Sequence, residues 1–72
     1  MKRTRVYARV GVKYANNNGT TYTCTGTRYE RNGEQVATMK SPCGWVCDVH
    51  GFCLLENGLY EWDYSTNGRF EK

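Results

Sequence analysis

The first part of the chain alternates between apolar and polar side chains. From residue 6 to residue 14 the even positions are Val, Ala, Val, Val and Tyr, whereas most odd positions from Arg3 to Lys13 are basic. A period of two is typical of a β-strand with one buried face. The pattern therefore predicts a first strand over Arg3–Tyr14, with one apolar face and one basic face.

The dipeptide Asn-Gly occurs four times, at positions 18–19, 32–33, 57–58 and 67–68. Each copy is flanked by β-branched, aromatic or alternating residues, and Asn-Gly in that setting is the strongest short-range signal for a β-hairpin. The pattern predicts two further strands, over about Thr20–Arg31 and Glu34–Lys40. Gly26 in the middle of the second strand indicates a bulge or a close approach.

The hairpin around Gly58 carries a large share of the aromatic side chains. A three-residue loop with Gly58 in the left-handed conformation pairs Phe52 with Trp62 and Leu54 with Tyr60, which gathers the aromatic rings on one face. A two-residue turn would pair Leu54 with an acidic residue, so we expect the longer loop. The same loop around Gly19 puts Tyr22 and Cys24 on the apolar face of the first strand. We expect residues 65–72 to add a short edge strand or to fray.

One segment departs from the strand pattern. Ser41 is a good helix N-cap, Pro42 suits the first helical position, and Gly51 suits a C-terminal cap. These signals predict one short helix over Pro42–His50.

Length and composition limit the class of protein. The 72 residues make one domain, residues 1–72. The mean hydropathy of −0.76 excludes a membrane-spanning protein, and the aromatic content of 14% excludes a disordered chain.

We expect a β-rich α+β domain, a small antiparallel meander of about five strands with one short helix in the order β-β-β-α-β-β. An SH3-like, partly closed barrel is the alternative architecture.

The net charge of +3 is divided unevenly, with +6 on residues 1–31 and −3 on residues 32–72. The basic face of the first strand supplies the candidate partner-binding residues, which are Arg3, Arg5, Tyr7, Arg9 and Lys13. Basic side chains contact phosphates and an aromatic ring can stack on a base. Tyr and Arg are also the residue types that dominate protein interfaces. The alternative is internal, in which Arg5 and Arg9 lie beside Glu61 and Asp63 on a neighbouring strand.

Four metal-ligand side chains lie close together in the sequence: Cys43, Cys47, His50 and Cys53. Three Cys and one His form an accepted structural zinc set, and zinc would stabilise a domain with a small core. Their spacing matches no standard zinc finger, and the alternative is that the thiols are small buried hydrophobes. We therefore expect no cofactor, with zinc as the alternative.

No residue pattern indicates catalysis. Cys43 lies at the start of the predicted helix, where a thiol pKa is lowered, but His50 lies too far along that helix to act as its base. We therefore expect a protein that is not an enzyme.

The absence of a secretory signal after Met1 predicts an intracellular protein with reduced cysteines and no membrane partner. We expect a binding protein that blocks or adapts a larger protein or nucleoprotein. Such small chains are often inhibitors encoded by phages or mobile elements, which is an association and not a residue argument. Nucleic-acid binding through the basic face is the first alternative, and a zinc-stabilised module is the second.

Overall fold

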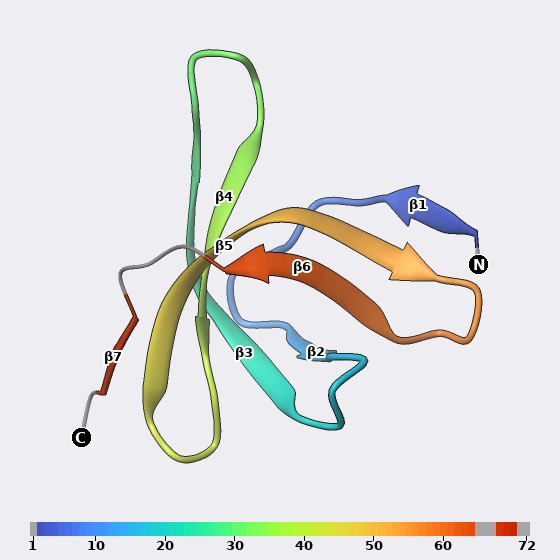
Figure 1. Cartoon of the computed structure of the whole chain (residues 1–72). Coiled ribbons are helices and arrows are strands. Elements are labelled where there is room, and N and C mark those ends of the chain that lie inside the picture. The colour runs from blue at the N-terminus through green and yellow to red at the C-terminus, as the bar shows by residue number, and fades with distance from the viewer. Residues whose placement is uncertain (1, 65–67, 71–72) are drawn as a thin grey trace.

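A computed structural model of the chain describes residues 2–64 and 68–70, which form one antiparallel sheet with short connections (Figure 1). Its strands are β1 (Arg3–Arg5), β2 (Lys13–Ala15), β3 (Thr21–Tyr29), β4 (Gln35–Lys40), β5 (Trp45–Leu55), β6 (Tyr60–Tyr64) and β7 (Arg69–Phe70). The strands β2, β3, β4 and β5 pair in chain order, as a meander does. The protein is therefore a small all-β domain, and its described part contains no helix.

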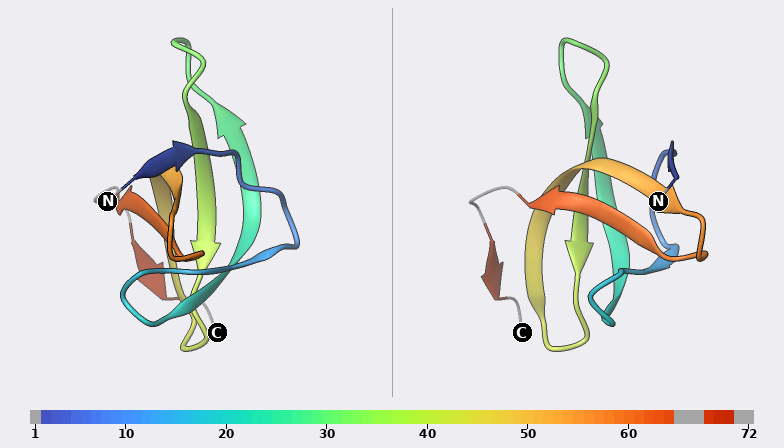
Figure 2. Two further views of the ribbon diagram at one scale, coloured as in Figure 1. Left: turned by 90° about the vertical axis from the view of Figure 1, so that its right-hand side faces the viewer. Right: turned by 45° about the vertical axis from the view of Figure 1, so that its right-hand side comes forward.

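The long strand β5 organises the sheet because it has neighbours along both edges. On one edge it pairs with β4 over its first half and with β1 over its last three residues. On the other edge it pairs with β7 and then with β6. The ladder with β6 is interrupted by a bulge between His50 and Cys53, where Gly51 has a φ of 65°. A bulge increases the local twist and bends a strand, and β5 curves across the molecule in Figure 1 and in the right-hand view of Figure 2.

The core lies on one face of this curved sheet. Met39, Val49, Cys24 and Cys47 are fully buried there, and buried aromatic side chains extend the core toward β6. Leu54 lies opposite Tyr60, and the rings of Phe52 and Trp62 stack with centroids 5.5 Å apart. The predicted gathering of aromatic rings on one face is thus confirmed. Tyr14 also lies opposite Tyr22, as the three-residue loop around Gly19 predicts.

The described Asn-Gly hairpins share one loop geometry. In each, the glycine has a φ between 83° and 91° and donates its N–H to the carbonyl three residues earlier. The asparagine Oδ1 accepts the N–H of the residue after the glycine, at 2.9 Å for Asn18 and Asn32 and 3.0 Å for Asn57. Gly and Asn are favoured here because a three-residue loop needs one left-handed residue. The fourth copy, at residues 67–68, includes a position outside the described residues.

The predicted helix over Pro42–His50 is wrong. Residues 41–45 form a fourth loop of the same geometry, in which Gly44 has a φ of 92° and donates to the Ser41 carbonyl at 3.0 Å. Ser followed by Pro is also the start of a type I turn, because proline's fixed φ suits the second position of that turn. The residues that follow include Trp45, Val46, Val49 and Phe52, and strands on both edges pair with them as β5. The order β-β-β-α-β-β is therefore replaced by strands alone.

The predicted first strand over Arg3–Tyr14 is also broken. Its ends form β1 and β2, but residues 6–12 cross between two distant edges of the sheet, because β1 pairs with β5 and β2 pairs with β3. Val10 and Val12, on the expected apolar face, are 60% and 40% exposed. The chain turns at Gly11, which has a φ of 88°.

The sheet is open, and one isolated bridge between Asn16 and Tyr60 draws the end of β2 toward β6. The Asn17 N–H also donates to the Tyr60 carbonyl at 2.9 Å, and these contacts are a step toward the partly closed barrel considered as the alternative. The short β7 lies where the tail was expected to add an edge strand. None of the described segments is a helix of the length and apolar character that a membrane span needs.

Candidate functional site

The candidate partner-binding residues do not share one flat strand face. Arg3 and Arg5 lie on β1, Tyr7 and Arg9 on the crossing segment, and Lys13 on β2. The side chains therefore spread over two edges of the sheet. For each basic residue, it matters whether an acidic side chain already forms an ion pair with it.

Only one of these cations is neutralised within the described residues. Arg3 Nη2 lies 3.1 Å from Glu61 Oε1, whereas Arg5, Arg9 and Lys13 form no ion pair there. The internal pairing of Arg5 and Arg9 with Glu61 and Asp63 is thus not formed. Although β1 and β6 lie on opposite edges of β5, Glu61 reaches across that strand and pairs with Arg3, not with Arg5.

An exposed aromatic pair lies beside Arg5. The ring of Tyr7 contacts the ring of Tyr29 with centroids 6.3 Å apart, and the two side chains are 57% and 62% exposed. A shallow concavity of about 360 Å³ is lined by Arg5, Tyr7 and residues 32–34. We call these residues together with Tyr29 the tyrosine surface.

Tyr29 was missed from the sequence. The β3–β4 ladder shifts between Cys24 and Gly26, so that the residues which share a face change from even to odd positions. Tyr29 thereby lies opposite Gln35, on the face toward the crossing segment. Gly26 had signalled the bulge, but the sequence did not show which side chain it would redirect.

Hydrogen bonds hold the crossing segment in place beneath Tyr7. The side-chain amide of Gln35 accepts the Ala8 N–H at 2.8 Å and donates to the Ala8 carbonyl at 2.9 Å, in a buried position. The next amide, that of Arg9, donates to the Tyr14 hydroxyl at 2.8 Å. Before Tyr7, the Val6 N–H donates to the Phe52 carbonyl at 3.3 Å, so the backbone is held on both sides of Tyr7.

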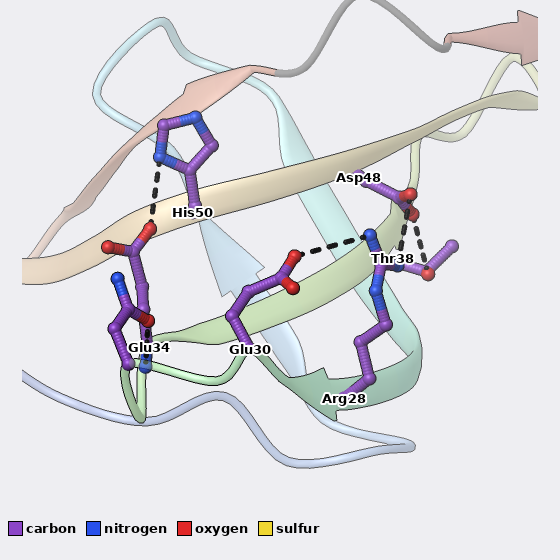
Figure 3. A network of polar contacts seen from close by, with 7 residues as sticks. Arg28, Glu30, Glu34, Thr38, Asp48 and His50 are labelled. Carbon is purple, nitrogen blue, oxygen red and sulfur yellow. Dashed lines mark hydrogen bonds and ion pairs between the residues drawn. The ribbon is translucent and has the colours of Figure 1, made fainter.

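A polar network extends over the outer face of β3, β4 and β5 and meets the tyrosine surface at Glu34 (Figure 3). Arg28 lies 3.2 Å from Asp48 and 3.9 Å from Glu30, and Thr38 Oγ1 donates to Asp48 at 2.9 Å. His50 Nδ1 lies 3.4 Å from Glu34 Oε1. These groups satisfy one another, so the network leaves the unpaired cations of the first half of the chain uncovered.

The four predicted zinc ligands point to different environments. Cys43 is exposed in the turn before β5, Cys47 lies in the core, and His50 faces Glu34. Cys53 Sγ donates to the Glu61 carbonyl at 3.4 Å. Among the described residues no group of three or more His, Cys, Asp or Glu side chains is placed to hold a metal ion. The helix that was expected to bring them together is absent.

The thiols also differ in acidity. A hydrogen bond with the Ser41 hydroxyl at 3.1 Å and then the Trp45 backbone lower the pKa of Cys43. Burial raises the pKa of Cys24, and burial followed by the charge of Asp48 raises the pKa of Cys47. Cys43 is therefore the most readily ionised of these three thiols.

No protein-family model, no curated protein and no solved structure matches the chain. The candidate site therefore rests on the chemistry of its own residues.

Proposed function

We propose that the chain is a non-enzymatic binding protein that attaches to a larger protein through the tyrosine surface and so blocks or adapts it. The observation that carries this proposal is the exposed Tyr7–Tyr29 pair beside an unpaired Arg5. Tyrosine buries a large, rigid, amphipathic ring at a low cost in side-chain entropy, and Tyr and Arg are enriched among binding hot spots. The two hydrogen bonds between Gln35 and Ala8 support the proposal, since a preorganised contact loses less entropy on binding.

A protein partner fits this surface better than a nucleic acid does. The carboxylate of Glu34 lines the same concavity as Arg5, and a carboxylate there repels a phosphate. The two rings are tilted by 50° and contact each other, so they do not form a row of open faces for successive bases. Mixed charges with tyrosine are typical of a protein interface.

The test is quantitative capture of partners by the tagged full chain after nuclease treatment. Wild type is compared with Tyr7→Ala plus Tyr29→Ala, and with Val10→Ser plus Val12→Ser as a matched pair of exposed substitutions on the same crossing. We expect a defined protein to be recovered in stoichiometric amount by wild type and by the valine variant. Its recovery is expected to fall at least tenfold with the tyrosine variant, because one hot-spot truncation costs about 2 kcal/mol or more.

If the wild-type chain, without nuclease treatment, recovered nucleic acid and no protein, the result would contradict this proposal. Equal recovery of the partner protein by wild type, the tyrosine variant and the valine variant would also contradict it. Both tyrosines are exposed, so their replacement is expected to change the free energy of unfolding by no more than about 0.5 kcal/mol, which thermal unfolding checks.

Nucleic-acid binding is the second candidate, favoured by the unpaired Arg5, Arg9 and Lys13. It predicts an affinity for an oligonucleotide that falls steeply as salt is raised, because each neutralised phosphate releases counterions. Arg5→Ala plus Arg9→Ala would then reduce both the affinity and its dependence on salt. Absence of binding at low salt, or binding that the double variant leaves unchanged, rules this candidate out.

A further inference from the structure

A second concavity lies on the sheet away from the tyrosine surface. It has a volume of about 340 Å³ and is lined by residues from β2, β3, β4 and the following turn, namely Lys13, Thr21, Thr23, Lys40, Ser41 and Pro42. Thr23 is near the start of β3 and Tyr29 is its last residue. They are six positions apart, which is at most about 20 Å along an extended strand. The two surfaces are therefore independent.

The strand register places two cations around a hydroxyl. Lys13 lies opposite Thr23, and Thr23 lies opposite Lys40, so the three side chains stand in one row on the same face. Neighbouring strands are about 4.8 Å apart, which puts the two lysine Cα atoms about 10 Å apart with Thr23 between them. A lysine side chain is long enough for both ammonium groups to approach one ligand above Thr23.

The charges in this concavity have no internal partner. Neither Lys13 nor Lys40 forms an ion pair within the described residues, and no acidic residue lines the concavity. The hydroxyls of Thr21 and Thr23 form no hydrogen bond among the side-chain contacts of the described part, so both are available as donors. The site thus offers two point charges and two hydroxyl donors.

We propose that this concavity binds a single phosphoryl group, either as free phosphate or on a phosphorylated small molecule or side chain. A phosphate at neutral pH carries a charge of about −1.5 to −2 and several strong acceptor oxygens, which two ammonium groups and two hydroxyls match. Lysine serves as a point-charge ligand for phosphate, and charge-assisted hydrogen bonds are the stronger kind. The lining contains no aromatic side chain on which a base could stack, and this favours one phosphoryl group over a nucleic-acid strand.

The test is calorimetric titration of the full chain with inorganic phosphate and, separately, with phosphoserine, at constant ionic strength in chloride. We expect saturable binding of at least one of them. The two probes distinguish the free ion from the phosphorylated side chain. Lys13→Gln plus Lys40→Gln is expected to lower that affinity about tenfold or more, since each charge-assisted hydrogen bond contributes at least a tenfold factor.

The matched control is Lys2→Gln plus Arg31→Gln, which removes the same charge from exposed residues outside the concavity. It is expected to leave phosphate affinity within about twofold of wild type, because screened distant charges contribute little. The proposal is overturned if neither probe binds, or if both double variants lose affinity equally. It is also overturned if a thymidine oligonucleotide binds through Lys13 and Lys40 while the phosphate probes do not. The tyrosine variant tests protein binding and leaves the phosphate titration unaffected. The proposal for the tyrosine surface and the proposal for the phosphoryl site can therefore fail independently.

Discussion

At the scale of single residues, the side chain of Gln35 supplies the backbone hydrogen bonds that a neighbouring strand supplies elsewhere in the sheet. Its amide bonds both the N–H and the carbonyl of Ala8, which is 4% exposed. A buried backbone group without a partner costs about as much as a lost hydrogen bond. The crossing segment can therefore leave the ladder between β1 and β2 because one side chain supplies the missing partners.

Replacing Gln35 by Ala is expected to lower the free energy of unfolding by about 2 kcal/mol or more, because it leaves two backbone groups of Ala8 unpaired. Chemical denaturation measures this change. Thr27→Ala, an exposed substitution on the adjacent strand, is the control and is expected to change stability by no more than about 0.5 kcal/mol. An equal effect of the two substitutions would show that the amide does not support the crossing.

Because of Tyr64, we expect the free energy of unfolding to depend on pH in the alkaline range. Burial, and then the Tyr22 hydroxyl at 3.2 Å, raise the pKa of Tyr64 from 10.0 to about 12. A raised pKa in the folded state means that the unfolded chain loses the proton first. This contribution to stability is present below about pH 10 and is lost as the pH rises toward about 12.

We expect the free energy of unfolding to fall across that interval, and to fall less steeply in Tyr64→Phe, which has no proton to lose. Denaturant titrations at successive pH values measure both slopes. The difference between the slopes reports Tyr64 together with its hydrogen bond to Tyr22. Identical slopes would contradict the assignment.

At the scale of elements, one loop geometry recurs in every described hairpin between consecutive strands from β2 to β6. Each loop has three residues, and a glycine at positive φ closes it. The loop at residues 41–45 reaches this geometry with Ser-Pro-Cys-Gly in place of an Asn-Gly pair. The Ser41 Oγ accepts the Trp45 N–H at 3.1 Å, a local contact that helps to close the turn.

Gly44→Ala distinguishes this hairpin from the helix that the sequence had indicated. In a helix interior, Gly to Ala stabilises by about 1 kcal/mol. In the hairpin it is expected to destabilise by about 1 to 2 kcal/mol, because Gly44 has a φ of 92°.

Gly26→Ala is the matched control, since Gly26 does not have a positive φ and an added Cβ meets only the Thr38 side chain, no closer than 3.8 Å. That distance is an ordinary van der Waals contact, and we expect a change of less than about 0.5 kcal/mol. Chemical denaturation of both variants gives the comparison. A stabilising effect of Gly44→Ala would favour the helix.

At the scale of the whole molecule, β5 decides which segments meet. The strand β1 pairs with its last residues and β7 pairs with its first residues, so β1 and β7 lie at opposite ends of β5 (Figure 1). Across the end of β5, Arg3 pairs with Glu61, whereas Arg5 and Arg9 form no ion pair within the described residues.

The contact of the C-terminal segment with β5 is tight at Gly68. A Cβ added there would overlap the indole ring of Trp45. Gly68→Ala is therefore expected to displace β7 and to lower stability by about 1 to 3 kcal/mol, as overpacking does. Amide hydrogen exchange measures the displacement. We expect faster exchange at Val46, whose register partner is Arg69. Unchanged exchange would contradict the contact, and Gly26→Ala again serves as control.

The amino-acid sequence by itself determined the local features of this protein. Alternation, β-branched residues and Asn-Gly pairs predicted the β-rich class, the described Asn-Gly hairpins and the aromatic face, because each depends on neighbours within a few residues. The same local signals misassigned residues 42–50, where Ser-Pro suits a helix start and a turn equally.

Only the tertiary structure decided which strands are neighbours. The predicted first strand is broken because β1 pairs with the end of β5 while β2 pairs with β3, and Glu61 pairs with Arg3 and not with Arg5. The bulge in β3 redirects Tyr29 toward Tyr7. Both outcomes depend on pairings between residues far apart in the chain. Such pairings are selected by packing of the whole sheet, and no short window of sequence contains them.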